Sequence, residues 1–170
     1  LWGAIAGGGL AGVLAARARG LAVPPLLDAA APGLALGEAV GRIGCLIDGS
    51  NLGPPTTLPW GVQYVHPLAQ APDFLLAHHP TPLYHTLAAL ALFGLLLALR
   101  RRGTRTGALF ATWLGMHALA RLGLGFVRVE PIIALELQVS QWWAVVALIG
   151  LGSGIIRARD RSERRAAGPT

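Results

Sequence analysis

Charge is scarce in this chain of 170 residues: charged side chains make up 13% of it, hydrophobic ones 54%, and the mean hydropathy is +0.56. An ordinary soluble domain carries about a quarter charged residues, so that class is excluded. Disorder is excluded as well, because disordered chains are poor in apolar residues. The class that remains is an integral membrane protein, and the length predicts a single domain.

Lysine is absent and cysteine nearly so. All 14 basic residues are arginines, which give a net charge of +6 but lie mostly between apolar stretches. This distribution favours cytoplasmic anchoring over a nucleic-acid surface, so we expect no nucleic-acid partner. Cys45 is the single cysteine, which excludes a disulfide within the chain. The chain begins at Leu1 without a charged leader, and we expect an N-terminal part to precede it rather than a signal peptide.

Long apolar stretches are abundant. Five of them approach the length of about 20 residues that a membrane-spanning helix needs. They cover residues 1–16, 25–47, 82–99, 107–127 and 140–156. Pro131 lies between the last two and separates them. The sequence therefore predicts an all-α, polytopic integral membrane protein with about five membrane-crossing helices, whose transmembrane domain spans residues 1–156.

Arginine is distributed unevenly among the connections between these stretches. When the stretches cross alternately, eleven of the fourteen arginines fall on one side. The connection 48–80 contains no arginine, whereas the tail 157–170 contains five. Arginine accumulates on the cytoplasmic side of membrane proteins. We therefore expect one large extracytoplasmic loop at 48–80 and a basic cytoplasmic tail at 157–170.

Three arginines do not follow this pattern: Arg42, Arg121 and Arg128. A charge near the bilayer centre costs roughly 2.5–3.5 kcal/mol, so such a residue usually faces the protein interior or a wet cavity. We expect Arg42 and Arg121 to do so in the outer half of the membrane. For Arg128 an equally good interpretation is an anchor that reaches the outer headgroups. The three guanidinium groups together could hold a phosphate.

His117, Arg121 and Arg128 fall within one broad stripe of a helix. A nearby guanidinium would keep the imidazole of His117 neutral, which is what a general base requires. The alternative is a core histidine that bonds to neighbouring backbone. The other histidines fit no metal-ligand spacing, so we expect no metal site; they are His66, His78, His79 and His85.

Glycine recurs at helical spacing in the second apolar stretch, at Gly33, Gly37, Gly41 and Gly44. Glycines four residues apart line one helix face and allow another helix to approach closely. We interpret this stripe as a packing face, because glycine offers backbone and no side-chain chemistry.

Three stretches form an ordered series: GRIGCLIDGSNLGPPTTLPWGV at 41–62, HPTPLYH at 79–85, and the later pair Arg121 and Arg128. The series resembles the bacterial prolipoprotein diacylglyceryl transferase family over nearly the whole chain. The resemblance implies a multi-pass enzyme of the bacterial inner membrane. Such enzymes transfer diacylglycerol from phosphatidylglycerol to the lipobox cysteine thiol of a preprolipoprotein. It also implies as partners phosphatidylglycerol, the preprolipoprotein signal peptide and membrane lipids, with no metal or organic cofactor.

The resemblance also implies roles for individual residues. Arg42 and Arg121 match essential arginines of the family, and Gly53 matches a functional glycine. His117 and His85 replace the family's tyrosine and glutamate and could serve as substitute bases. The expected catalytic set is thus Arg42, Arg121, His117 and His85. The expected substrate-binding set is Gly53, Asp48, Asn51, Tyr84 and Arg128.

One departure from the family pattern supports a second interpretation. The early His-Gly-Gly of the family corresponds here to Gly7, Gly8 and Gly9. The alternative is therefore a catalytically impaired homologue that acts as a phospholipid-binding membrane protein. An anion channel or transporter fits less well, because the chain lacks the repeated halves common in transporters.

The arginine distribution generates a labelling prediction. In a variant that carries Asp73→Cys and in which Cys45 is replaced, a membrane-impermeant thiol reagent should label the cysteine in intact cells, because 48–80 is expected outside. A cysteine placed at Arg102 should react only after lysis. Labelling of position 73 only after lysis would contradict the topology.

Overall fold

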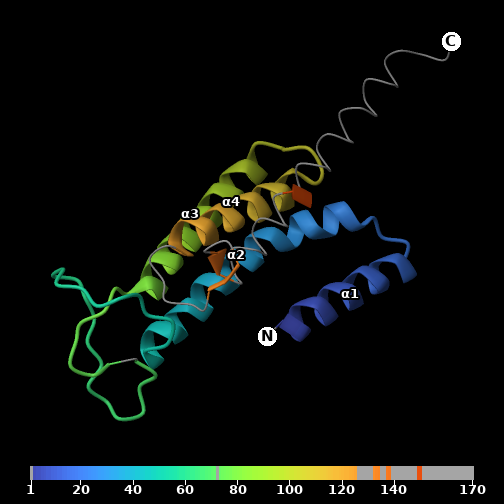
Figure 1. Cartoon of the computed structure of the whole chain (residues 1–170). Helices are drawn as coiled ribbons and strands as arrows, with labels where there is room; N and C mark the ends of the chain where they lie inside the picture. The colour runs from blue at the N-terminus through green and yellow to red at the C-terminus, as the bar shows by residue number, and fades with distance from the viewer. Residues whose placement is uncertain (1, 72, 126–131, 135–136, 139–148, 151–170) are drawn as a thin grey trace.

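The computed structural model describes residues 2–71, 73–125, 132–134, 137–138 and 149–150. Most of this part of the chain is helical (Figure 1). The helices are α1 (Trp2–Ala18), α2 (Val23–Asp48), α3 (Thr81–Arg101) and α4 (Ala108–Gly125). Two short strands follow, β1 (Ile132–Ala134) and β2 (Leu137–Gln138), which pair antiparallel with Ile132 opposite Gln138.

The helical fold class predicted from the sequence is confirmed. Each of the first four predicted stretches coincides with a described helix to within two residues at either end. The fifth stretch, 140–156, lies outside the described residues except for 149–150. The short strand pair was not predicted. Among the described helices, α2 and α3 are long and apolar enough to cross a membrane.

The ends of α2 follow from local sequence. Prolines lie in the first turn of the helix, where a backbone N–H has no partner within the helix, so proline's lack of an N–H costs nothing there. Ala22, just before the helix, is extended. At the other end Gly49 adopts a left-handed conformation with φ 77°, and its N–H donates to the Cys45 carbonyl. A Cβ at Gly49 would also lie 3.1 Å from the ring of Tyr64, so glycine meets both demands.

Helix α2 packs most extensively against α3, and α4 lies against both (Figure 1). The contact face of α2 is made of alanines: Ala31, Ala35 and Ala39 are buried. They allow α3 to come close enough for Leu92 and Leu96 to pack between the helices. The core is completed by Leu109 and the partly buried Phe93, Leu99, Phe110 and Trp113.

The glycine stripe of α2 is not this face. All four of its glycines are exposed, and a Cβ built at each would meet no described atom within 4 Å. Within the described helices the prediction of a glycine packing face is therefore wrong. The physical reason is that alanine is already small enough for the approach of α3, while its methyl group adds contact that glycine cannot provide.

A carboxylate from α2 holds the start of α4. Asp28 accepts hydrogen bonds from the backbone N–H of Gly107, at 2.5 Å, and of Phe110, at 2.8 Å. The first N–H groups of a helix have no partner within it, and the helix dipole favours a negative charge at that end. Asp28 thus acts as an N-cap supplied by another helix, and it fixes where α4 begins beside α2.

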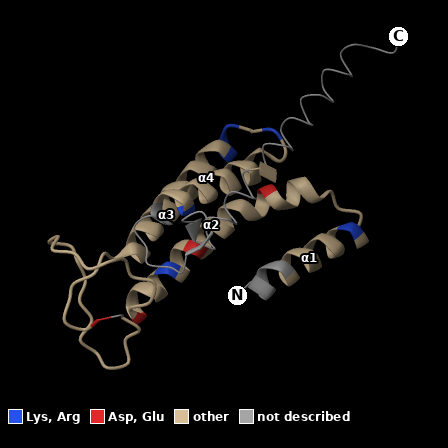
Figure 2. Cartoon of the chain, viewed as in Figure 1, with Lys and Arg blue, Asp and Glu red and all other residues tan. Residues whose placement is uncertain are grey.

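The basic connections lie at one end of the described helices and the long loop at the other (Figures 1 and 2). Arg17 lies in the last turn of α1 and Arg19 just beyond it, and a cluster of four spans the end of α3 and the connection to α4: Arg100, Arg101, Arg102 and Arg105. The long flanks between the two ends carry few charges (Figure 2). Many large apolar side chains are exposed on the helices, as expected for surfaces that face lipid.

The Asp28 contacts generate a stability prediction. Asp28→Ala should lower the free energy of unfolding by about 1–2 kcal/mol, because two N–H groups at the start of α4 lose their acceptor. Thermal unfolding of the purified protein in detergent measures the change. Asp73→Ala is the matched control, since Asp73 accepts from the N–H of Leu75 within its own loop and bonds to no helix in the part of the chain that the structure describes. Equal effects of the two substitutions would contradict the capping role.

Candidate functional site

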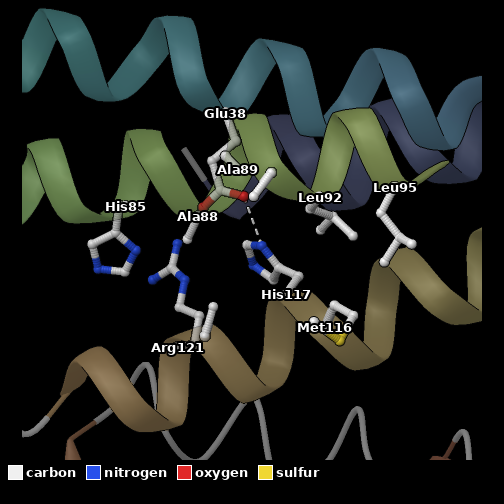
Figure 3. A pocket seen from close by; sticks show the side chains of 11 residues that line it. Glu38, His85, Ala88, Ala89, Leu92, Leu95, Met116, His117 and Arg121 are labelled. Atoms are coloured by element: carbon white, nitrogen blue, oxygen red, sulfur yellow. Dashed lines mark hydrogen bonds and ion pairs between the residues drawn. The ribbon is translucent and has the colours of Figure 1, made fainter. Parts of the chain in front are cut away.

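A cavity of about 260 Å³ lies between α3 and α4. Its polar lining consists of Glu38 from α2, His85 from α3, and His117 and Arg121 from α4. Figure 3 shows His85 extending from α3 and Arg121 from α4 toward the space between the two helices. The rest of the lining is apolar: Ala88, Ala89, Ala91, Leu92, Leu95, Met116 and Ala120.

His117 is held by a carboxylate and by an aromatic ring. Its Nδ1 lies 2.7 Å from Oε2 of Glu38 (Figure 3), and its ring stacks on Trp113 with centroids 5.4 Å apart. Because an ionised carboxylate only accepts hydrogen bonds, Nδ1 of a neutral His117 carries the proton. The lone pair then lies on Nε2. The alternative prediction for His117 was a core histidine bonded to neighbouring backbone. The structure instead bonds it to the side chain of Glu38.

Two arginines act on the same carboxylate. Glu38 interacts electrostatically with Arg121 of α4 and with Arg42, one turn further along α2. The Arg42 side chain is buried, at 9% relative exposure. Arg42 is buried and Arg121 lines the cavity, so both arginines face the interior or a cavity as predicted. Their nearness to Glu38 avoids the cost of unpaired charge in an apolar setting.

All four residues of the predicted catalytic set lie in or beside this region. His85, His117 and Arg121 line the cavity, and Arg42 lies one turn from Glu38 on α2 and interacts with it electrostatically. His85 is buried at 5% relative exposure near the start of α3. Glu38 was missed as a site residue. A signal was present in the sequence, because Asp28, Ala31, Ala35, Glu38 and Arg42 follow a 3-4-3-4 spacing that places them on one stripe of α2.

The loop between α2 and α3 forms a second polar group. The N–H of Gly53 donates to the His79 carbonyl and the Gly53 carbonyl lies 2.9 Å from Nδ1 of His78. Tyr84, in the first turn of α3, has a hydroxyl that accepts from Nε1 of Trp60 at 2.9 Å and lies 3.2 Å from Nδ1 of His79. These bonds tie the family-like stretch around Gly53 to the start of α3.

Asp48 and Asn51 lie where this loop leaves α2. The Asp48 carboxylate accepts from the N–H of Ser50 at 2.8 Å, and the Asn51 carbonyl accepts from the Thr81 hydroxyl. Tyr64 donates its hydroxyl to the Leu46 carbonyl. Burial raises the pKa of Tyr64, and the nearby Asp48 carboxylate raises it further, so the phenol stays protonated.

The four described members of the predicted substrate-binding set lie in the loop or at the helix ends that border it, and none of them lines the cavity. Gly53 and Tyr84 are joined through His79, and Asp48 and Asn51 lie at the α2 end of the same loop. Arg128 lies outside the described residues. Within the described ranges, no group of three His, Cys, Asp or Glu side chains is placed to hold a metal ion.

Two long apolar helices, together with a partly buried cluster of guanidinium, imidazole and carboxylate groups at a cavity between helices, define a helical membrane protein with a polar internal site. Comparison with known families makes this assignment specific. The family model described as prolipoprotein diacylglyceryl transferase matches residues 1–157, so the chain belongs to that family. The resemblance noted in the sequence is confirmed.

Individual relatives carry the name phosphatidylglycerol–prolipoprotein diacylglyceryl transferase. The protein from Frankia alni is 37% identical over 88% of this chain and 40% of its own length. Those from Mycobacteroides abscessus and a Nostoc species are 32% and 34% identical, over 93% and 90% of this chain and 50% and 56% of their own lengths. The chain thus spans about half the length of the curated relatives it matches. No solved structure matches it.

Proposed function

We propose that this protein is a phosphatidylglycerol–prolipoprotein diacylglyceryl transferase. The observation that carries the proposal is the cluster in which Arg42 and Arg121 act on one carboxylate beside the cavity that His117 lines. Two guanidinium groups in an apolar setting suit the phosphate of an anionic lipid, and the imidazole suits a thiol proton. The names of the relatives supply the lipid and the protein substrate.

The reaction follows from these groups. The lipobox cysteine thiol gives its proton to Nε2 of His117, and the sulfur attacks the glycerol carbon that bears the phosphate. A carbon–sulfur bond forms while the carbon–oxygen bond to phosphate breaks, and glycerol phosphate leaves with the electron pair. Arg42 and Arg121 stabilise the charge that develops on this leaving group. His85, on the opposite wall of the cavity, is the second candidate base.

The loop residues have a separate role in this proposal. The lipid headgroup or the preprolipoprotein signal peptide would reach the cavity from the loop end and be bound there by Gly53, Asp48, Asn51 and Tyr84. Arg128 would add a further contact to phosphate. The bonds that tie Gly53 to the start of α3 support a loop of defined shape at this end. Neither a metal ion nor an organic cofactor takes part in the proposed reaction.

The proposed setting is the bacterial inner membrane, with about five crossings and the C-terminal tail in the cytoplasm. Support comes from the separation of basic connections and long loop at opposite ends of the described helices (Figure 2). On this basis the loop 48–80 is extracytoplasmic, and membrane lipids surround the exposed apolar faces. The charged cluster then lies on the loop side of the helices' midpoint.

A second candidate function is that of a catalytically impaired homologue that binds phospholipid. The observation in its favour is the run Gly7, Gly8 and Gly9 in place of the family's early histidine. The two functions are separated by incubating the purified protein with phosphatidylglycerol and a lipobox peptide. Formation of the thioether-linked diacylglyceryl peptide supports the transferase. Saturable binding of phosphatidylglycerol without product supports the second candidate.

His117 generates a kinetic prediction. His117→Ala should lower the rate of transfer about 100-fold or more, which is the usual contribution of a general base. The assay follows diacylglyceryl peptide over time at saturating lipid. His66→Ala serves as the control, because His66 lies in the exposed loop and should leave the rate unchanged. An unchanged rate in His117→Ala would shift the role of base to His85 or solvent.

Arg42 generates a prediction about side-chain shape. A guanidinium binds phosphate as a planar two-pronged donor, whereas an ammonium group acts as a point charge. Arg42→Lys should therefore impair transfer nearly as much as Arg42→Ala, with membrane insertion close to normal. Arg101→Lys, at an exposed position, is the matched control. Full activity of Arg42→Lys would show that Arg42 is only an anchor, since lysine anchors equally well.

A further inference from the structure

Glu38 is a carboxylate that the proposed reaction has not yet used. It lies among apolar residues of α2 and contributes to the cavity wall, with its side chain at 18% relative exposure against 25% for His117. An ionised carboxylate in such a setting is costly unless it is paired and hydrogen-bonded. It belongs to none of the three stretches that carry the family resemblance.

The contacts of Glu38 converge on one side of the cavity. Its Oε2 lies 2.7 Å from Nδ1 of His117, and its charge acts on Arg121 and Arg42. The charged or titratable groups that α2, α3 and α4 bring to this region are thus Glu38, Arg42, His85, His117 and Arg121. Glu38 is the single anion among these five, and His117 is the partner to which it bonds directly.

A histidine whose Nδ1–H is donated to a carboxylate has a fixed tautomer and ring orientation. Its Nε2 carries the lone pair, and the carboxylate stabilises the positive ring that forms when Nε2 accepts a proton. Stacking against Trp113 restrains the same ring from its face. The two contacts leave Nε2 as the ring atom able to take a proton from a substrate.

We propose that Glu38 is a positioning residue that orients His117 as the base for the lipobox thiol. This inference rests on the proposed transferase function and deepens it. The thiol proton passes to Nε2 of His117, the Nδ1 proton stays on the ring, and the Glu38 carboxylate remains ionised throughout. Glu38 itself touches neither substrate. Its charge also limits how strongly the two arginines hold an anionic lipid before reaction.

The first test needs no enzymatic activity. The full chain is labelled with ¹⁵N at its five histidines and placed in lipid nanodiscs at pH 8, and the His117 signals are identified by their loss in His117→Gln. We expect the Nδ1 of His117 to be protonated and its Nε2 to be unprotonated. In Glu38→Gln the tautomers should mix, because an amide can both donate and accept. Asp28→Asn should leave the His117 tautomer unchanged, since its carboxylate bonds to the backbone of α4.

The second test is kinetic. Glu38→Gln should lower kcat about tenfold or more, in the range observed when an orienting partner of a histidine is lost. The KM for phosphatidylglycerol should not rise, because the two arginines lose their competing anion. A variant damaged only in its packing would instead lose lipid binding as well. The double variant Glu38→Gln, His117→Gln should be no slower than His117→Gln alone, because residues that act as a unit are not additive.

The outcomes separate the two proposals. If the wild-type chain transfers no diacylglycerol, the proposed function fails, and the NMR test still decides whether Glu38 fixes the His117 tautomer. The positioning role is overturned if the His117 tautomer is the same in wild type and Glu38→Gln. It is also overturned if an active wild type and Glu38→Gln have equal kcat. Glu38→Asp, which keeps the charge, guards against a folding defect and should retain more activity than Glu38→Gln.

Discussion

The need to pair charge inside an apolar bundle governs this structure. Helix α2 carries Glu38 and Arg42 one turn apart. On α4, His117 bonds to Glu38 and Arg121 interacts with it electrostatically. In water such pairs would contribute little, but within apolar surroundings an unpaired charge is costly. The register of α4 along α2 is therefore fixed by chemistry as well as by packing. The proposed catalytic site occupies the place where this constraint is strongest.

Helix α2 organises the described helices because one stripe of its surface performs three tasks. Asp28 caps the start of α4, Ala31 and Ala35 admit α3 to close contact, and Glu38 with Arg42 completes the charged cluster. Anchoring α4 near its start and again near its end prevents it from sliding along α2. A site built on helices held in this way is more rigid than one built on a loop.

The loop complements the cavity from the other end of the helices. Hydrogen bonds from Gly53 to His79, and from Trp60 to Tyr84, attach it to the start of α3, the same helix that carries His85 into the cavity. The loop residues proposed to bind a headgroup or peptide can therefore be kept in a fixed relation to the cavity residues proposed to act on the reacting bond. Such positioning is a large part of what an enzyme contributes to a reaction between two bound substrates.

The class of protein, the family and four helices to within two residues at each end could be predicted from the sequence. So could the placement of Arg42 in the interior and of Arg121 at a cavity. Hydropathy and the cost of buried charge act on each residue almost independently of its neighbours, so they can be read along the chain. The sequence did not reveal that alanine rather than glycine packs α2 against α3, that Asp28 caps α4, or that Glu38 bonds to His117. Each of these depends on which helix lies opposite and in what register. That information is set by the sum of contacts between segments some 80 residues apart and by no local pattern.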